Sequence, residues 1–361
     1  MDFTFDDQQL AFHEAVRKFL VVEAAPEMLR EIWETKSGRS AELRAKLADQ
    51  GLTALSVPEA HDGLGQGVLD WVLVQQELGY HAIPDSLSDT AYLAVYILNG
   101  LSAQASLSGG LPAGGKIAAE WLPKIAGGGV RLAVGHPINP LVADAENAGL
   151  LLLWHNDEVH ALKPAQAQLS FNASIDMSRR LYKINWTPND LSCVCNAQHG
   201  KALWEGVINR ASLATAAQLL GLAQRMLDLG IDYAAQRKQF GKPVGSFQAV
   251  KHHLADVAVK IEFAKPVVHR AAYALGRKHK DVGIHVSHAR LAAGEAARLA
   301  ARKSIQVHGA MGYTWEADLQ MFAKRAWVLD AAWGDRAFHK SRVANHVLAL
   351  DAVLGPGDTF N

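Results

Sequence analysis

The spacing of apolar residues changes twice along this 361-residue chain, and that change constrains its fold more than any other feature. Up to about residue 120 the apolar residues recur at helical spacing, and Phe12, Val16 and Phe19 share one helical face. From Val130 to Trp186 they gather in short runs that are typical of strands. The helical spacing returns near Leu203. The pattern predicts an α+β fold with an N-terminal helical domain, a small β-domain and a C-terminal helical bundle.

The periodicity also predicts the domain boundaries, at 1–120, 121–198 and 199–361. The β-domain should be mostly antiparallel, because Asn156-Asp157 is suited to turning one apolar run back onto the next. The third domain should begin with a long helix in a bundle, since its apolar seam is narrow and rich in alanine. The seam consists of Leu213, Ala216, Leu220, Ala223 and Leu227. Further helices are expected over 246–278, 284–307, 317–332 and 335–353.

Composition and charge exclude several classes of protein. The chain has 36 basic and 36 acidic residues, so it lacks the basic excess that nucleic-acid binding requires. The sequence has neither a secretory signal nor an apolar run long enough to span a membrane, so the expected location is the cytoplasm. Its two cysteines, Cys193 and Cys195, are too few for a disulfide framework or a structural zinc site and are interpreted as reduced thiols.

Other short motifs fail for identifiable reasons. The segment Gly110–Lys116 matches the start of a phosphate-binding loop, but Ile117 stands where Ser or Thr should ligate magnesium, and no strand precedes it. We therefore expect a loop over 108–115. The 16 histidines do not form a zinc-binding frame with a third ligand, so no metal is predicted. Neither a serine nucleophile elbow nor a dinucleotide fingerprint is present.

Two segments between predicted helices carry residues suited to a phosphorylated cofactor. The first, Arg237–Gln248, places an arginine beside a Phe-Gly-Lys-Pro turn, where its guanidinium could clamp a pyrophosphate with two hydrogen bonds. The second, Gln306–Glu316, contains Gly309 and Gly312, which allow a ligand or another backbone to approach closely. Each segment alone is also typical of an ordinary interhelical loop. Their presence together is more specific.

Together these segments resemble the two flavin-contacting signatures of the acyl-CoA dehydrogenase family. Leu52–Glu59 and Gly63–Gly67 are similar to the N-terminal domain of that family, so the resemblance covers nearly the whole chain. It implies the same three-domain fold, a dimer or tetramer, and FAD lying across a subunit interface. The implied FAD contacts are Arg237, Gln239, Phe240, Phe247, Gln248, Gln306, Gly309 and Gly312.

The resemblance also implies a reaction, the α,β-desaturation of an acyl-CoA thioester. In the family a carboxylate base removes the α-proton, the β-hydride passes to flavin N5, and an electron-transferring flavoprotein accepts the electrons. The base is usually a Glu at a fixed distance after the Gly-Tyr pair, and here that position is Trp333. The alternative base position of the family is Ala211, followed by Ser212. Asp335 is the nearest substitute, but it should point off the required face.

The β-domain departs from the family pattern as well. The segment Arg131–Pro140 lacks the expected Thr-Glu-Pro-x-x-Gly-Ser-Asp loop, and Trp186-Thr187 lies too late to replace the Trp-Ile-Thr-Asn-like strand. Both elements hold the flavin ring in the family. The resemblance and these departures from it together imply a chain with no catalytic residue of its own, which completes the FAD site of a second acyl-CoA dehydrogenase subunit in an α2β2 assembly. By analogy the acyl-CoA substrate would be a bulky, steroid-type thioester from lipid or steroid degradation.

Three alternatives remain open at this stage. The chain could be a self-sufficient homo-oligomeric acyl-CoA dehydrogenase with an unrecognised base. It could be a flavin monooxygenase or oxidase on the same scaffold, although that would still need a flavin-ring cradle. Finally, it could be a purely structural subunit that binds no FAD.

Overall fold

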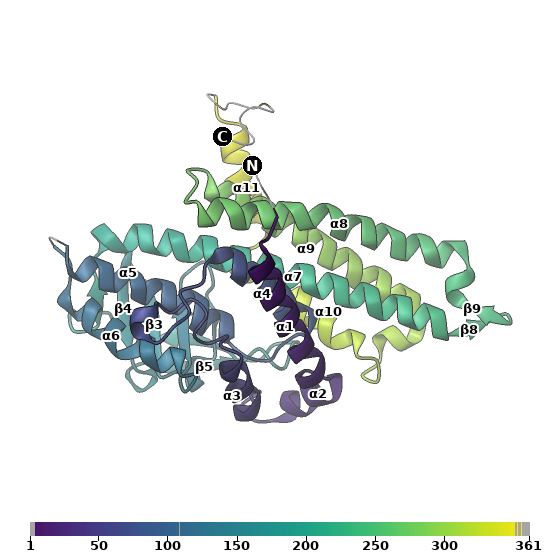
Figure 1. The fold of residues 1–361 in the computed structure, drawn as a ribbon, viewed down its shortest axis with the longest axis horizontal. Helices are drawn as coiled ribbons and strands as arrows, with labels where there is room; N and C mark the ends of the chain where they lie inside the picture. Colours follow the sequence, from purple (N-terminus) through teal and green to yellow (C-terminus); the bar gives the residue numbers. More distant parts are fainter. Residues whose placement is uncertain (1–3, 108, 351, 353–354, 356–361) are drawn as a thin grey trace. The chain divides into compact units, whose positions relative to one another are not determined.

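The computed structural model describes residues 4–107, 109–350, 352 and 355. The chain divides into two compact units (Figure 1). The first, called here the bundle unit, comprises Met1–Val22, Val68–Ala82 and Ser212–Asn361. The second, the sheet unit, comprises Glu23–Gly67 and Ile83–Ala211. The order of elements confirms the predicted fold class, while the three domain boundaries stay a prediction.

The bundle unit is built from helices and one small hairpin. Its helices are α1 (Asp7–Glu23), α4 (Val68–Tyr80), α8 (Gln248–Gly276), α9 (Val282–His308), α10 (Leu319–Leu329) and α11 (Arg336–Val347), with the short turns η5 (Val244–Ser246) and η6 (Gly309–Tyr313). The hairpin pairs β8 (Lys238–Gln239) with β9 (Lys242–Pro243). Helix α7 (Ala197–Gln236) belongs to both units. The predicted helix over 335–353 ends early, at Val347, and residues 351 and 353 lie outside the described residues.

The predicted apolar seam of the long helix is confirmed, because all five of its residues are buried in α7. Two glycines bring α4 and α7 into backbone contact. A Cβ atom on Gly221 would lie 1.9 Å from the backbone oxygen of Gln76, and one on Gly79 would lie 2.1 Å from that of Gln218. No side chain fits there, so glycine sets the distance between these helices.

Replacing Gly221 with alanine should therefore destabilise the chain. The new methyl group must force the backbones apart, and such overpacking costs about 1–3 kcal/mol, which outweighs the roughly 1 kcal/mol that alanine gains in helix propensity. Gly276→Ala is the matched control, because a Cβ there meets nothing within 4 Å. Urea denaturation should show a lower free energy of unfolding for Gly221→Ala and an unchanged or higher one for the control. A more stable Gly221→Ala variant would contradict the close contact.

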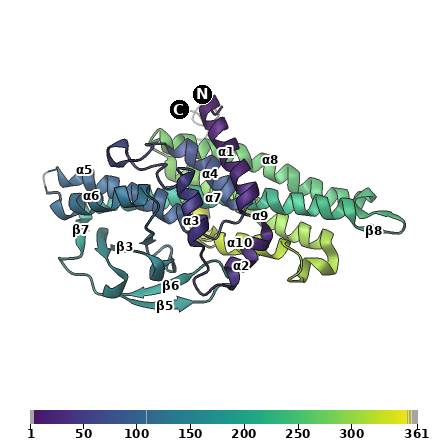
Figure 2. The same cartoon turned by 60° about the horizontal axis from the view of Figure 1, so that its bottom comes forward.

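The sheet unit combines helices with the remaining described strands. Its helical elements are α2 (Pro26–Glu34), α3 (Ala41–Asp49), η1 (Glu59–His61), η2 (Ser88–Ala94), α5 (Val95–Ala105), α6 (Pro112–Ala126), η3 (Ala145–Asn147) and η4 (Pro164–Gln166). Its strands are β1 (Leu132–Gly135), β2 (Val142–Ala143), β3 (Leu150–His155), β4 (Glu158–Leu162), β5 (Gln168–Asn172), β6 (Leu181–Asn185) and β7 (Cys193–Cys195). They form two sheets with the orders β1-β3-β4-β7 and β2-β6-β5 (Figure 2). Among the described pairs of this unit, β1 with β3 is parallel and the others are antiparallel.

The Asn156-Asp157 turn is confirmed. Both residues have positive φ (48° and 66°), as a two-residue hairpin turn requires, and they join β3 to β4. The loop expected over 108–115 is wrong from Pro112 onward, where α6 begins. Proline suits the first turn of a helix, and Gly114 lets α6 pack closely, because a Cβ there would lie 2.6 Å from the backbone oxygen of Val194. Ser108 lies outside the described residues.

A buried ion-pair cluster in the sheet unit joins helix α3 to the loop before η2 and to the residue that precedes strand β1. The Asp85 carboxylate, 2% exposed, accepts hydrogen bonds from Arg44 Nη1 and Arg131 Nη2, both at 2.8 Å. Arg44 also donates to the backbone oxygens of Gly128 and Val130. This satisfies a buried guanidinium on several sides, as burial of a charge demands. Among the helices the structure describes, none is long and apolar enough to cross a membrane.

Candidate functional site

Both segments predicted to contact the cofactor lie at one end of the bundle unit, where α7 ends, α8 begins and α9 ends (Figure 1). Three contacts join these helix ends. The rings of Tyr233 and His308 stack with centroids 4.3 Å apart. Ser304 Oγ donates a hydrogen bond to the backbone oxygen of Met226 at 2.7 Å, and Lys303 Nζ lies 2.9 Å from His253 Nδ1. We call this end, with the 237–248 and 306–316 segments, the clamp end.

The β8–β9 hairpin projects from the clamp end through a strained turn. Phe240 and Gly241 form its two-residue loop, and both have positive φ (53° and 76°). Such a turn favours Asn or Gly at its first position, and the left-handed conformation costs another residue about 1–2 kcal/mol. The Phe240 side chain is nonetheless 89% exposed, so packing within the chain compensates little of this cost. Strained, exposed positions of this kind often serve a binding function.

The main chain around Arg237 is fixed, but its side chain is unpaired. The Arg237 amide donates to the Tyr233 oxygen at 2.9 Å, and its carbonyl accepts from the Val244 amide at 2.8 Å. The exposed guanidinium makes no hydrogen bond or ion pair with any residue that the structure describes. Gln239, Gln248 and Gln306 are likewise exposed. The clamp end therefore presents several amide groups and three positive charges to solvent, those of Arg237, Lys238 and Lys242.

Phe247 and Gln248 lie where α8 begins. Phe247 is the N-cap residue of α8 and contributes no side-chain hydrogen bond to the cap. Its ring packs edge-on against Phe240 at 6.1 Å and lies 4.4 Å from Lys242 Nζ. The first amide groups of this 29-residue helix, with their partial positive charge, therefore lie close to the hairpin. This adds to the attraction of the clamp end for an anion.

The two glycines of the second segment have different roles. Gly309 ends α9 with φ 60° and ψ −136°, a conformation that other residues disfavour, although a Cβ there would meet nothing within 4 Å. Gly312 is buried, and a Cβ on it would lie 2.8 Å from the backbone oxygen of Ile305. Gly309 thus gives the exposed turn its shape. Gly312 allows η6 to pack onto α9, a structural reason for glycine that holds with or without a ligand.

Exposed aromatic residues beside these glycines were not singled out from the sequence as contacts. Tyr313 is 81% exposed, and Trp315, also exposed, has Lys324 Nζ 3.5 Å from its ring centroid. The signal for them was present, because the short 311–315 stretch between two helices contains Met, Tyr and Trp. Exposed large side chains gathered at one site often mark a binding surface.

Neither base position can abstract a proton. Trp333 is buried with φ 54°, and its carbonyl oxygen accepts a hydrogen bond from Ser212 Oγ at 3.4 Å. Ala211 is also buried. The Asp335 carboxylate caps α11 by accepting the Phe338 amide at 2.8 Å. Asp335, the candidate substitute base, therefore already uses its carboxylate as the N-cap of α11.

Two other titratable groups near Trp333 are also engaged. Asp330 pairs with Arg290 Nη1 at 3.0 Å and with Arg298. His339 is buried, and its Nδ1 lies 3.1 Å from Ser287 Oγ. Burial, helped by nearby Arg290, lowers the pKa of His339 to about 4. It is a neutral core histidine, inaccessible to a substrate.

In the sheet unit, the loop after β1 closes on itself. The His136 carbonyl accepts the Asn139 amide at 2.8 Å, and His136 Nδ1 accepts the Ile138 amide at 3.1 Å. The His136 ring packs against Trp154 and Trp204, with centroids 5.4 and 5.5 Å away. The hollow beside this loop has a volume of about 180 Å³, less than the roughly 300 Å³ of a small ligand pocket. This loop offers no hydroxyl or carboxylate to a flavin ring.

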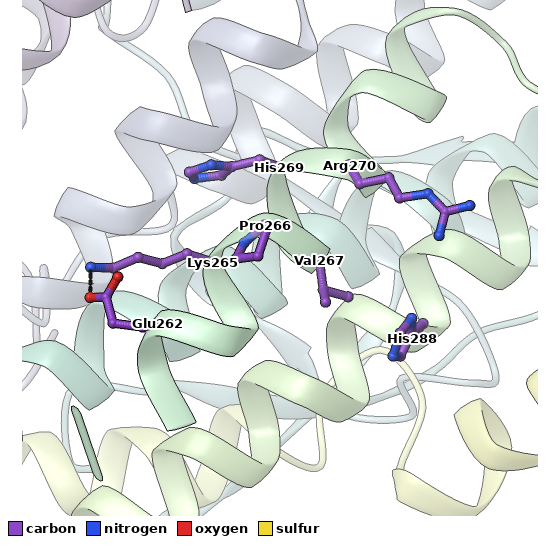
Figure 3. A pocket seen from close by; sticks show the side chains of 7 residues that line it. All are labelled: Glu262, Lys265, Pro266, Val267, His269, Arg270 and His288. Carbon is purple, nitrogen blue, oxygen red and sulfur yellow. Dashed lines mark hydrogen bonds and ion pairs between the residues drawn. The ribbon is translucent and has the colours of Figure 1, made fainter. Parts of the chain in front are cut away.

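A larger pocket, of about 440 Å³, lies along α8 and α9 in the bundle unit (Figure 3). Figure 3 shows Lys265 directed toward Glu262, with His269 and Arg270 on the next turn of α8 and His288 on α9. Burial lowers the pKa of His269 to about 4. The pocket was not anticipated from the sequence. It is lined by neither of the two predicted segments, and so is separate from the clamp end.

Comparison with known proteins identifies the family. Residues 6–129 match the N-terminal domain of acyl-CoA dehydrogenases, and residues 198–348 match the C-terminal domain. The acyl-CoA dehydrogenase IpdE2 of Mycobacterium tuberculosis (strain ATCC 25618 / H37Rv) is 30% identical over 324 residues, covering 89% of this chain and 91% of that protein. The chain therefore belongs to the acyl-CoA dehydrogenase family, which is a family of flavin-dependent oxidoreductases. The expected family resemblance is confirmed.

Solved structures show the same fold. The ChsE4–ChsE5 complex from Mycobacterium tuberculosis matches with a TM-score of 0.81 and 22% identity, covering 98% of this chain and 100% of the other. A variant of the Tcur3481–Tcur3483 steroid ACAD matches with a TM-score of 0.80 and 20% identity, covering 94% and 97%. At these identities the likeness establishes the fold alone.

Proposed function

We propose that this chain is the non-catalytic subunit of a heteromeric acyl-CoA dehydrogenase, whose clamp end completes the FAD site of a partner subunit. One observation carries the proposal: Arg237 is fixed through its backbone and free at its guanidinium, while the base positions Trp333 and Ala211 hold no proton acceptor. A chain that grips a cofactor without a base of its own needs a second chain to perform the reaction.

The clamp end fits the nucleotide half of FAD. A guanidinium can bind a pyrophosphate with two parallel charge-assisted hydrogen bonds, and the beginning of α8 adds backbone amides of the same polarity. The amides of Gln248 and Gln306 suit the polar edges of ribose and adenine, and the exposed rings of Phe240 and Tyr313 suit stacking. FAD, when bound, is the group that accepts the hydride. The residues of this chain hold the cofactor in position and supply positive charge beside its pyrophosphate.

The same residues make an independent active site unfavourable. Removal of an α-proton needs a carboxylate or another base within hydrogen-bond reach of the substrate. Here Asp335 caps a helix and Asp330 is held by two arginines, so neither carboxylate is available. The partner would supply the base, the flavin-ring cradle and the acyl-CoA tunnel, and its flavin would pass electrons to an electron-transferring flavoprotein. The two family matches leave residues 130–197 between them, where the ring cradle is expected.

The assembly and substrate are inferred by analogy. One matching structure is a complex of two differently named chains, ChsE4 and ChsE5, and another is described as a steroid ACAD. We infer an α2β2 assembly that acts on a bulky, steroid-type acyl-CoA. Its location in the cytoplasm stays a prediction.

Flavin content tests the proposal directly. The chain should be purified alone and together with a second acyl-CoA dehydrogenase chain that has Glu at one of the two base positions. The complex should carry one FAD for every two chains and reduce a dye with acyl-CoA, whereas the chain alone should carry little flavin and show no activity. Stoichiometric FAD and substrate-dependent dye reduction by the chain alone would establish a self-sufficient enzyme instead.

A further inference from the structure

Three side chains of metal-ligand type lie on one face of the β4–β7 pair in the sheet unit. Glu158 and His160 are two residues apart on β4, so they point to the same side of the sheet. His160 is paired directly with Cys193 of β7. One carboxylate oxygen, one imidazole nitrogen and the thiol sulfur all lie within 4.8 Å of one another. Oxygen, nitrogen and sulfur are the ligand atoms that proteins offer to zinc.

A neighbouring serine holds the His160 ring in place. Ser192 Oγ lies 2.9 Å from His160 Nδ1 and 2.8 Å from the Asn189 carbonyl oxygen. In a metal-binding histidine one ring nitrogen is typically hydrogen-bonded to such a partner while the other binds the ion. Here Nδ1 has that partner, and Nε2 is the nitrogen that faces Glu158.

The other ring nitrogen faces a carboxylate. His160 Nε2 lies 3.1 Å from Glu158 Oε2, within hydrogen-bond distance, and the His160 ring is buried. A cation bound at this point would take the place of the hydrogen between these two atoms, with the Cys193 thiol as its third protein ligand. The nitrogen, the oxygen and the sulfur are thus close enough to one another to bind one ion.

We propose that Glu158, His160 and Cys193 bind one Zn²⁺ ion, with water as the fourth ligand. Zinc ligands at about 2.0–2.3 Å from a tetrahedral ion are separated from one another by about 3.3–3.6 Å. The Glu158–His160 distance of 3.1 Å is close to this value, and the thiol needs to move by about 1.5 Å at most. Binding transfers the Cys193 thiol proton to solvent, and the thiolate and carboxylate then balance the two charges of the ion.

Access and position fit a bound ion with one open position. The Glu158 side chain is 34% exposed and Cys193 is partly exposed, so an ion can enter from solvent, whereas His160 at 2% anchors the site from within. The ion would link β4 to β7 just before α7 begins at Ala197. Trp204 of α7 also donates to the Glu158 backbone oxygen, at 2.9 Å. The site is independent of the clamp end and of the proposed function.

Cobalt provides a spectroscopic test on the full-length chain. After treatment with a chelator, the protein should bind one Co²⁺ with a thiolate charge-transfer band in the near ultraviolet, and Zn²⁺ should displace it. Cys193→Ser should abolish the band and weaken Zn²⁺ binding about 100-fold or more, and Ser192→Ala should weaken it about tenfold by releasing the His160 ring. Circular dichroism verifies that each variant is folded.

Cys195→Ser is the matched control on the same strand. The Cys195 thiol points elsewhere, toward Gln104 Oε1 at 2.7 Å, so this variant should keep the band and the affinity. If Cys193→Ser does not fold, thiol alkylation of the wild type replaces it, and Zn²⁺ should protect Cys193 but leave the alkylation rate of Cys195 unchanged. A wild-type chain without the band at one equivalent of Co²⁺, or equal losses in both cysteine variants, would overturn the zinc site.

Discussion

Replacement of Arg237 by alanine is expected to weaken FAD binding by the heteromeric complex about 30- to 140-fold. A hydrogen-bonded interaction between charged groups contributes about 2–3 kcal/mol, and each 1.4 kcal/mol corresponds to a factor of ten. The exposed Arg237 side chain makes no hydrogen bond or ion pair with the described part of the chain, so the variant should fold and assemble normally. The loss should therefore appear in flavin content and dye reduction, and not in thermal stability.

Two variants make this measurement specific. Arg277→Ala removes the same charge at the opposite end of α8, where the guanidinium lies against the ring of Tyr273, and should leave FAD binding unchanged. Arg237→Lys should bind FAD with intermediate affinity, because an ammonium group keeps the charge but not the two-pronged geometry. The readout is the dissociation constant from a flavin fluorescence titration of the apo-complex. Unchanged flavin binding in Arg237→Ala would favour the purely structural subunit.

The parts of the fold that follow from local periodicity could be predicted from the sequence. The seam of α7 and the turn at Asn156-Asp157 depend on residues close together in the chain, and both are confirmed. The apolar runs that predict strands lie at 130–134, 150–154, 159–162 and 181–186. Strands β2, β5 and β7 lie outside them and were missed, because their residues are polar or few. β5, Gln168–Asn172, is largely exposed and exists because it pairs with β6, a partner that its own sequence does not reveal. The first turn of α6 was mistaken for a loop because Gly114 is there for packing and not for flexibility.

The candidate sites divide in a similar way. Arg237 and Gln306 could be proposed from the sequence because each belongs to a recognisable segment. The cost of the Phe240 turn, the burial of Gly312 and the capping role of Asp335 depend on backbone geometry, which spacing does not encode. The zinc proposal shows the largest gap. A search for helical histidine spacing cannot find Glu158, His160 and Cys193, since two strands that are distant in sequence bring them together.

The largest effect on stability is expected from Asp85→Ala. This change leaves Arg44, which is buried, without its counter-charge, and breaking a buried ion pair on one side costs about 3–5 kcal/mol. Arg131 loses the same partner. The control is Glu120→Ala, which removes an exposed ion pair with Lys124 at a similar distance of 2.7 Å. It should cost no more than about 0.5 kcal/mol, because solvent already screens that pair.

The difference in free energy of unfolding between wild type and Asp85→Ala should depend on pH, and this dependence distinguishes loss of the ion pair from loss of packing. Burial alone would raise the pKa of Asp85, but Arg44 and Arg131 outweigh it and hold the pKa below the ordinary value of 3.8. A carboxyl group whose pKa is lowered in the folded state stabilises that state above pH 3.8. This contribution decreases as the pH falls from 3.8 toward the pKa of the folded state. Urea denaturation should therefore show the full difference between wild type and Asp85→Ala near neutral pH and a smaller one below pH 3.8. A constant difference across that range would assign the loss to a cavity instead of to charge.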